Sequence, residues 1–213
     1  MLRKSIYSIL LISLFLSTTT LNGQDIRELP EPQKQGGKPL MEALQERQSS
    51  RAFANKTMND QMLSNLLWAA YGINRPGSGK RTAPSSHNVQ DIQVYAATAD
   101  GAFLYLPEKN ALRQITAKDV RGAMGLQDFV GSAAVNLVYV SDFSKYSGGD
   151  DHVKMITAAA HTGFIGQNVY LFCASEGLNT VFRAMVDKAE IIEILELGEH
   201  QHVMYSQSVG FPK

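Results

Sequence analysis

One stretch of the chain sets its architecture: DHVKMITAAAHTGFIGQNVYLFCASE, residues 151–176, followed by Gly177. The stretch contains no proline and is long enough for about seven helical turns. Its apolar residues occupy nearly every face, which is typical of a helix buried in a core or at a subunit interface. Gly177 can adopt the left-handed conformation that commonly ends a helix. The sequence therefore predicts a long, buried central helix over residues 151–176.

Helices and strands are mixed on both sides of this helix. Residues 92–96 and 102–106 are predicted strands, and Asp100-Gly101 between them is typical of a hairpin turn. Asn59 can cap a helix whose apolar residues recur at helical spacing. Further helices are predicted at 40–47, 118–125 and 188–195, and further strands at 133–140, 179–182 and 202–209. The mixture predicts an α+β layered domain over residues 39–213.

The N-terminal segment has a different composition. Arg3 and Lys4 precede a largely apolar run, and small polar residues follow up to Gly23. This order predicts a secretory signal peptide over residues 1–23 and an exported, periplasmic protein with no stable membrane insertion after cleavage. An uncleaved membrane anchor is the alternative. Residues 24–38 are rich in Gln, Glu, Pro and Gly, and we interpret them as a linker.

Charge and cysteine content narrow the function classes. Lysine plus arginine equals aspartate plus glutamate, 20 each, so no basic excess indicates a nucleic-acid partner. The single cysteine, Cys173, excludes an internal disulfide and lies in an apolar run typical of a buried thiol. The fold must therefore be held by core packing, by a cofactor or by a partner subunit.

Three short patterns resemble known catalytic or binding motifs but lack essential parts. The run 77–80, Gly-Ser-Gly-Lys, lacks the first glycine and the final Ser/Thr of a phosphate loop and follows a predicted helix. His200 and His202 would share one strand face, but zinc needs three or four ligands, so we expect no metal site. Ser85, Ser86 and His87 are adjacent without a nucleophile elbow, which argues against hydrolysis.

Two polar clusters are the better candidates for a ligand site. Residues 47–51, Arg-Gln-Ser-Ser-Arg, place two guanidinium groups four residues apart with hydroxyls between them. Arginine binds phosphate through paired hydrogen bonds, so this cluster suits a phosphate monoester; a solvated basic helix end is the alternative. Residues 81–88, Arg-Thr-Ala-Pro-Ser-Ser-His-Asn, form a polar loop that leads directly into a predicted strand.

Four segments resemble, in order, the motifs of one flavoprotein family. They are residues 47–53 (RQSSRAF), 74–76 (NRP) with 80–85 (KRTAPS), 166–171 (GQNVYL) with 176–181 (EGLNTV), and 209–212 (VGFP). The chain thus resembles the nitroreductase family, and within it the thiazole/oxazole dehydrogenase-like branch, over roughly residues 40–212. The resemblance implies a nitroreductase-like α+β fold with a central, mostly antiparallel sheet flanked by helices. It also implies a homodimer that shares two FMN sites.

The resemblance also assigns roles to individual positions. The FMN phosphate and ribityl chain would be held by Arg47, Gln48, Ser49 and Arg51, with the flavin N1/O2 edge as an alternative partner of Arg51. The opposite subunit would line the isoalloxazine with Pro84, Ser85, Ser86 and Asn88. Gln127 would face the pyrimidine edge, and a backbone N–H at Ala184 or Met185 would meet flavin N5. The chain departs from the family at 183–185, where Arg-Ala-Met replaces a glycine-rich run.

The implied activity is that of an FMN-dependent oxidoreductase. A small donor would reduce the flavin and leave, and a small acceptor (nitro, quinone-like or other) would then enter, a ping-pong cycle. The flavin carries this chemistry, so no catalytic acid or base of the protein is expected. The identity of the electron donor is not determined by the sequence, because NAD(P)H is not expected outside the cytoplasm. The alternatives are an exported flavin-binding or structural protein without turnover, and a flavin-free interaction module.

Overall fold

The computed structural model describes residues 25–213, so the predicted signal peptide at 1–23 lies outside the described residues. The helices are α1 (Leu40–Glu46), α2 (Asp60–Tyr71), α3 (Asp151–Glu176) and α4 (Lys188–Ile194), with short 3-10 turns η1 (Pro76–Ser78), η2 (Ser86–Asn88), η3 (Arg121–Met124), η4 (Val130–Ser132) and η5 (Phe143–Lys145). The strands are β1 (Ile26–Glu28), β2 (Ile73–Arg75), β3 (Lys80–Arg81), β4 (Ile92–Thr98), β5 (Gly101–Leu106), β6 (Ala111–Thr116), β7 (Val135–Asp142), β8 (Asn179–Arg183) and β9 (Gln201–Gly210).

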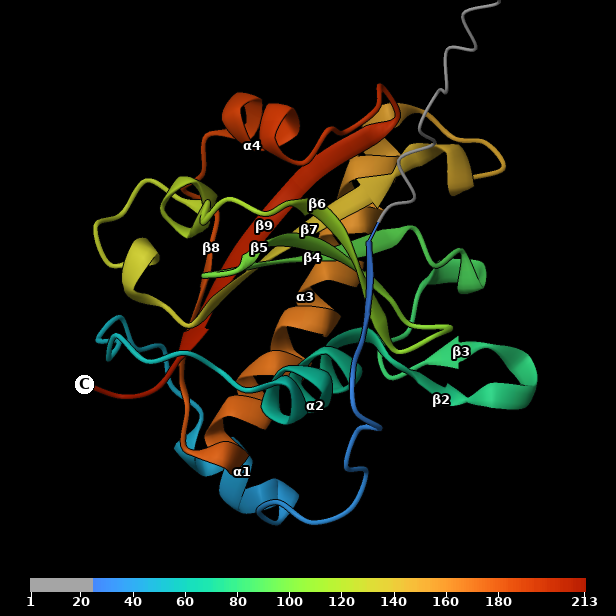
Figure 1. Cartoon of the computed structure of the whole chain (residues 1–213). Helices are drawn as coiled ribbons and strands as arrows, with labels where there is room; N and C mark the ends of the chain where they lie inside the picture. Colours follow the sequence, from blue (N-terminus) through green and yellow to red (C-terminus); the bar gives the residue numbers. More distant parts are fainter. Residues whose placement is uncertain (1–24) are drawn as a thin grey trace, which may run out of the picture.

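A seven-stranded sheet forms the centre, in the order β1-β6-β5-β4-β7-β9-β8. Every neighbouring pair in it is antiparallel. The hairpin predicted at Asp100-Gly101 is present, because β4 and β5 pair from Thr98 and Gly101 onward. β2 and β3 form a separate small hairpin, as Figure 1 shows. The predicted α+β fold with a central antiparallel sheet is confirmed.

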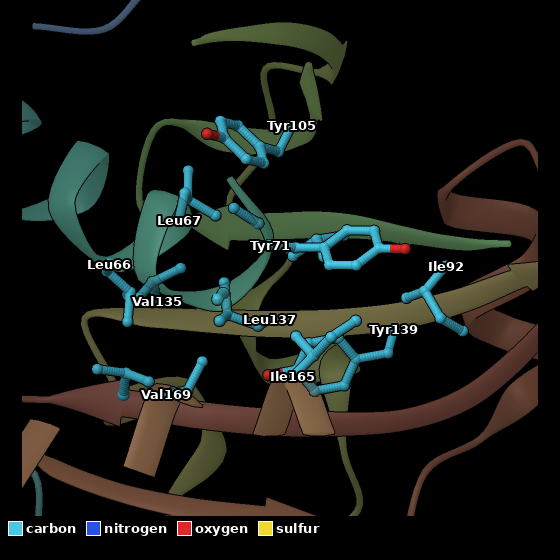
Figure 2. Close-up of a cluster of buried hydrophobic side chains, with 14 of the residues drawn as sticks. Leu66, Leu67, Tyr71, Ile92, Tyr105, Val135, Leu137, Tyr139, Ile165 and Val169 are labelled. Atoms are coloured by element: carbon cyan, nitrogen blue, oxygen red, sulfur yellow. The ribbon is translucent and has the colours of Figure 1, made fainter. Parts of the chain in front are cut away.

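Each face of the sheet packs against a hydrophobic cluster. On one face, α2 and α3 cover β4, β5 and β7, and Figure 2 shows their side chains meeting. The side chains labelled there are Leu66, Leu67, Tyr71, Ile92, Tyr105, Val135, Leu137, Tyr139, Ile165 and Val169. On the other face, η3, η4 and α4 cover Val138 and Val140 of β7 through Met124, Val130 and Ile191. Successive side chains of β7 point to opposite faces of the sheet, so this one strand contributes residues to both clusters.

The predicted central helix is α3, and Figure 1 shows it running along the sheet. Asp150 caps its N-terminus by accepting from the Val153 N–H at 3.0 Å. Gly177, with φ 68°, ends it in the left-handed conformation. One face of α3 packs into the core, whereas Val153, Ile156 and Phe164 are 52%, 59% and 46% exposed. Within one chain, an apolar stripe of the helix therefore has no cover from residues 25–213.

The structure differs from the sequence-based assignment at several short elements, the β2–β3 hairpin among them. The segment interpreted as a linker contains β1, which pairs with β6 from Ile26 opposite Arg113. Neither β1 nor β6 was expected: β1 has only three residues and pairs with residues far away in the sequence, and β6, ALRQIT, lacks a strict alternation of apolar and polar residues. The helix expected at 118–125 is only the short turn η3.

Within residues 25–213, no helix is both long enough and apolar enough to cross a membrane.

Candidate functional site

The first predicted cluster follows α1 directly and lies beside the start of β8. The Ser50 N–H donates to the Thr180 carbonyl at 2.9 Å, and the Asn179 side chain donates to the Ala52 carbonyl at 2.7 Å. Phe53, 5% exposed, anchors the segment in a small apolar cluster. These backbone contacts fix residues 47–53 against the sheet and leave the polar side chains at the surface.

Tyr170 of α3 connects this cluster to the sheet. The Arg47 guanidinium lies over the Tyr170 ring, 5.2 Å from its centroid. The Tyr170 hydroxyl is 2.7 Å from Ser49 Oγ and accepts from the Phe182 N–H at 2.9 Å. Within residues 25–213, neither Arg47 nor Arg51 forms an ion pair with a carboxylate. Both guanidinium groups are therefore available to an anionic ligand.

A second group of predicted residues meets at the far end of β8. The Leu126 N–H donates to the Met185 carbonyl at 3.2 Å, which places Gln127 beside Ala184 and Met185. Ala184 and Met185 are exposed, Met185 by 59%. Thr180 and Ala184 are four residues apart, which is about 13 Å of extended strand. The structure thus brings two of the predicted groups, 47–51 and 127 with 184–185, to opposite ends of one strand.

Arg183 lies beneath this second group as a buried cation, 5% exposed. Its guanidinium donates only to neutral acceptors: the Met124 carbonyl, Gln127 Oε1, Asn136 Oδ1, Ser206 Oγ and Ser208 Oγ, at 2.9–3.5 Å. Its Nε has no partner within the described residues. Burial lowers the pKa of Arg183 to about 10, so the side chain stays charged at neutral pH. A Cβ on Gly125 would lie 1.8 Å from Arg183 Nη1, so any larger residue there would force the guanidinium out of its hydrogen-bonded position.

The third predicted group, residues 84–88, belongs to a loop on the N-terminal half of α3. The Ser86 N–H donates to His161 Nε2 at 2.7 Å. Pro84, Ser86 and Asn88 expose their side chains to solvent. His161 and Tyr170 are nine residues apart on α3, which is roughly 13 Å along the helix axis. One chain therefore does not bring residues 84–88 to the other two groups.

A cavity of about 540 Å³ lies elsewhere, between residues 33–38, α2 and the C-terminal half of α3. Its lining includes Trp68, Asn168 and Phe172. Of the predicted site residues, none lines it. The candidate site follows the outer edge at β8 instead, and in a single chain it is an open surface.

Comparison with known proteins identifies the family to which this chain belongs. Residues 44–211 match the nitroreductase family, and the chain belongs to that family. This confirms the resemblance at the family level. The family's members are oxidoreductases that generally use a flavin and typically work as dimers on small-molecule substrates.

Three relatives illustrate the range of similarity. A nitroreductase of Methanocaldococcus jannaschii is 28% identical over 173 residues, covering 76% of this chain and 86% of that protein. The crystal structure of a nitroreductase from Ralstonia eutropha is 37% identical, with a TM-score of 0.84 over 88% of this chain and 90% of that one. The NADPH:FMN oxidoreductase of Vibrio harveyi, 21% identical with a TM-score of 0.61 over 82% and 69% of the two chains, shares the fold.

Sequence reasoning missed the side chains that fix this site in place. Tyr170 lies in one of the family-like segments but carries no local signal for its contact with Ser49 and Phe182. Arg183 was noted as a departure, but its burial depends on which face of β8 it occupies. His161 was only one of several histidines in the sequence, and its contact with the Ser86 N–H needed the fold.

Proposed function

We propose that this nitroreductase-family chain is an FMN-dependent oxidoreductase that passes a hydride or electrons from a small donor to a small acceptor such as a nitro or quinone-like compound. Donor and acceptor use the same site in turn, a ping-pong cycle. One observation carries the proposal. Arg47 and Arg51, which have no carboxylate partner within residues 25–213, lie at one end of β8, and the exposed Ala184–Met185 segment lies at the other end. One elongated ligand with an anionic end can contact both.

The residues present fit FMN. A phosphate monoester is a dianion, and two guanidinium groups with the Ser49 hydroxyl match its charge and its need for donors. At the other end, the Gln127 amide and the exposed backbone of 184–185 offer polar groups of the kind that meet the edge of a planar ring. When bound, FMN supplies the redox chemistry.

The protein's own residues bind the cofactor and set the electrostatics. Arg47, Ser49 and Arg51 hold the anionic end, and Tyr170 keeps Ser49 in place. The charge of buried Arg183 is not cancelled by a carboxylate within residues 25–213, so it raises the positive potential near Gln127. A positive potential at that end favours any ligand state that gains negative charge.

The proposal includes a homodimer. Exposed apolar side chains occur towards both ends of α3: Val153, Ile156 and Phe164 between its first turn and its middle, and Leu40, Met41 and Leu44 on α1, which lies beside its C-terminal half. Burying one such side chain stabilises an interface by roughly 1.5–3 kcal/mol. A second copy that covers the exposed apolar stripe of α3 can also bring its own residues 84–88 to the candidate site. Within one chain, these residues do not reach that site.

We also propose an exported, periplasmic protein, with residues 1–23 as signal peptide and an uncleaved membrane anchor as the alternative. The basis is the order of basic, apolar and small polar residues in that segment. Membership of the thiazole/oxazole dehydrogenase-like branch is proposed from residues 74–76 with 80–85 and from residues 166–171 with 176–181. Export would require a donor other than cytoplasmic NAD(P)H.

The test is a titration of the purified protein with FMN. Arg47→Ala with Arg51→Ala is expected to weaken FMN binding by at least about tenfold, a loss of roughly 1.4 kcal/mol, without unfolding the chain. The matched control is Lys109→Ala with Lys118→Ala, which removes the same charge from exposed positions on the β5–β6 side. Equal FMN affinity in the two double variants would refute the phosphate assignment.

A further inference from the structure

A buried ionisable pair lies under residues 84–90, and the proposed redox chemistry does not use it. His161 Nδ1 is 2.6 Å from Asp91 Oδ1, and the two residues are 3% and 0% exposed. The second oxygen of Asp91 accepts from Ser141 Oγ at 2.6 Å and from the Tyr146 hydroxyl at 3.0 Å. Burying a charge is costly unless it is paired and hydrogen-bonded, and here both oxygens of Asp91 have hydrogen-bond partners. A buried carboxylate with this full set of partners indicates a specific structural or functional role.

The hydrogen bonds specify the state of both groups. Burial alone would raise the pKa of Asp91, but the hydrogen bonds from His161, Ser141 and Tyr146 hold it below its usual value. Because an ionised carboxylate only accepts, His161 must carry its proton on Nδ1. The lone pair of Nε2 is then free to accept, and it receives the Ser86 N–H at 2.7 Å. The pair thus presents one oriented acceptor to the backbone of the loop.

The loop that it holds is strained. His87, Asn88 and Gln90 have φ values of 49°, 55° and 50°, in the left-handed region that side chains other than glycine rarely adopt. Such residues persist only where surrounding contacts determine them, and they cluster at ligand sites. Ser86 and His87 also line a cavity of about 390 Å³ between the loop, residues 145–148 and the first turns of α3.

The far end of the loop is held separately. The Gln90 N–H donates to Ser85 Oγ at 3.0 Å, and its side chain bonds to Arg81 Nε at 2.8 Å and to the Gly79 carbonyl at 3.1 Å. Gln90 therefore fixes the loop to the β2–β3 hairpin, and His161 fixes its beginning to α3. Between these two anchors, the side chains of Ser86, His87 and Asn88 remain exposed.

We propose that Asp91 and His161 are positioning residues that hold residues 84–90 in the strained conformation in which the loop tip contacts FMN bound by the partner protomer. This inference rests on the proposed function. The same helix that carries His161 also carries the exposed Val153, Ile156 and Phe164 stripe, so the pair ties the loop to the proposed interface. The alternative is a buried hydrogen-bonded pair that stabilises the fold without setting the conformation of the loop.

Two substitutions at one position separate these roles. In His161→Asn, the amide can reach the position of Nδ1 and keep the bond to Asp91, but no acceptor reaches the Ser86 N–H. In His161→Gln, the longer side chain places an amide oxygen near the position of Nε2 and restores that acceptor. We expect His161→Asn to weaken FMN binding by about tenfold and His161→Gln to remain within about threefold of the natural protein.

A third substitution removes the donor without touching the buried pair. Ser86→Pro deletes the N–H at the first position of η2, where proline is tolerated, and Ser85 is already extended (φ −139°, ψ 151°), as a residue before proline requires. We expect it to weaken FMN binding as much as His161→Asn does. It also provides the test if His161→Asn fails to fold.

The measurements are FMN affinity, thermal midpoint, and hydrogen exchange of residues 85–90 in the full chain without FMN. Positioning predicts faster exchange across the loop in His161→Asn and Ser86→Pro, with recovery in His161→Gln. Unchanged exchange in His161→Asn and Ser86→Pro would overturn the proposal. It would also be overturned if, across the three variants, the loss of FMN affinity simply paralleled the drop in thermal midpoint. If the natural protein binds no FMN, the proposed function fails, and the proposal fails with it because the loop then has no flavin to contact. Exchange alone then shows whether the pair still fixes the loop.

Discussion

Replacing Tyr170 by phenylalanine tests the link between the anionic end of the site and the sheet. The substitution keeps the ring, and with it the contact to Arg47, but removes the hydroxyl that bonds Ser49 and accepts from the Phe182 N–H. A buried donor left without a partner costs about 1–3 kcal/mol, and Tyr170 is half-buried, so we expect a loss of about 1.5 kcal/mol. For a domain of this size, that corresponds to a thermal midpoint lower by about 3–6 °C.

The assay combines thermal unfolding with FMN titration. Because Ser49 loses its anchor, FMN affinity is expected to fall by about three- to tenfold. The matched control is Tyr205→Phe, a half-buried tyrosine that packs against the same Phe182 ring, 4.8 Å between centroids. Its hydroxyl has no hydrogen-bond partner within the described residues, so little change is expected. If Tyr170→Phe and Tyr205→Phe behave alike in both measurements, the role given to Tyr170 is refuted.

Four further outcomes follow from the same structure. Arg183→Met is expected to lower the midpoint potential of bound FMN, measured by spectroelectrochemistry; an unchanged potential would contradict the electrostatic role. Gly125→Ala, whose Cβ would displace the Arg183 guanidinium, should reduce the free energy of unfolding by about 2 kcal/mol in denaturant titrations. The pKa of Asp91 is lower in the folded than in the unfolded protein, so ionised Asp91 stabilises the fold above the unfolded pKa, near 4. This stability is lost as pH falls through the folded pKa. Asp91→Asn should therefore flatten the acid side of a plot of unfolding free energy against pH. Phe164→Lys should convert a dimer to a monomer in sedimentation experiments, and a wild-type monomer would remove the proposed interface.

Much of the fold could be predicted because its signals are local. The run 151–176 is long enough to be recognised as a helix by composition, and Asn59 and Gly177 are capping residues of the expected kinds. β1 was missed because a three-residue edge strand has no usable period, and its pairing depends on residues far away in the sequence. β6 forms a hairpin with β5 and was missed because its residues do not alternate strictly between apolar and polar. A mixed chain of this length therefore reveals its long elements more readily than its sheet edges.

The candidate site was predictable only in part. Arg47, Ser49 and Arg51 are close in sequence, so their residue types alone indicated an anion site. The supporting contacts join distant positions: Ser49 to Tyr170 and Asp91 to His161. Their meeting depends on the register of strands against α3, which sequence patterns do not specify. Whether residues 84–88 reach the site from a partner subunit stays a prediction.

The central claim is that the protein binds FMN and transfers electrons through it. The most direct measurement is the visible spectrum of purified residues 24–213 after incubation with FMN and desalting, followed by anaerobic photoreduction and addition of a nitroaromatic acceptor. The account predicts retained flavin bands that bleach on reduction and return with the acceptor faster than for free reduced FMN. A protein that emerges without flavin bands, or whose reduced flavin is not reoxidised faster than the free cofactor, would contradict it.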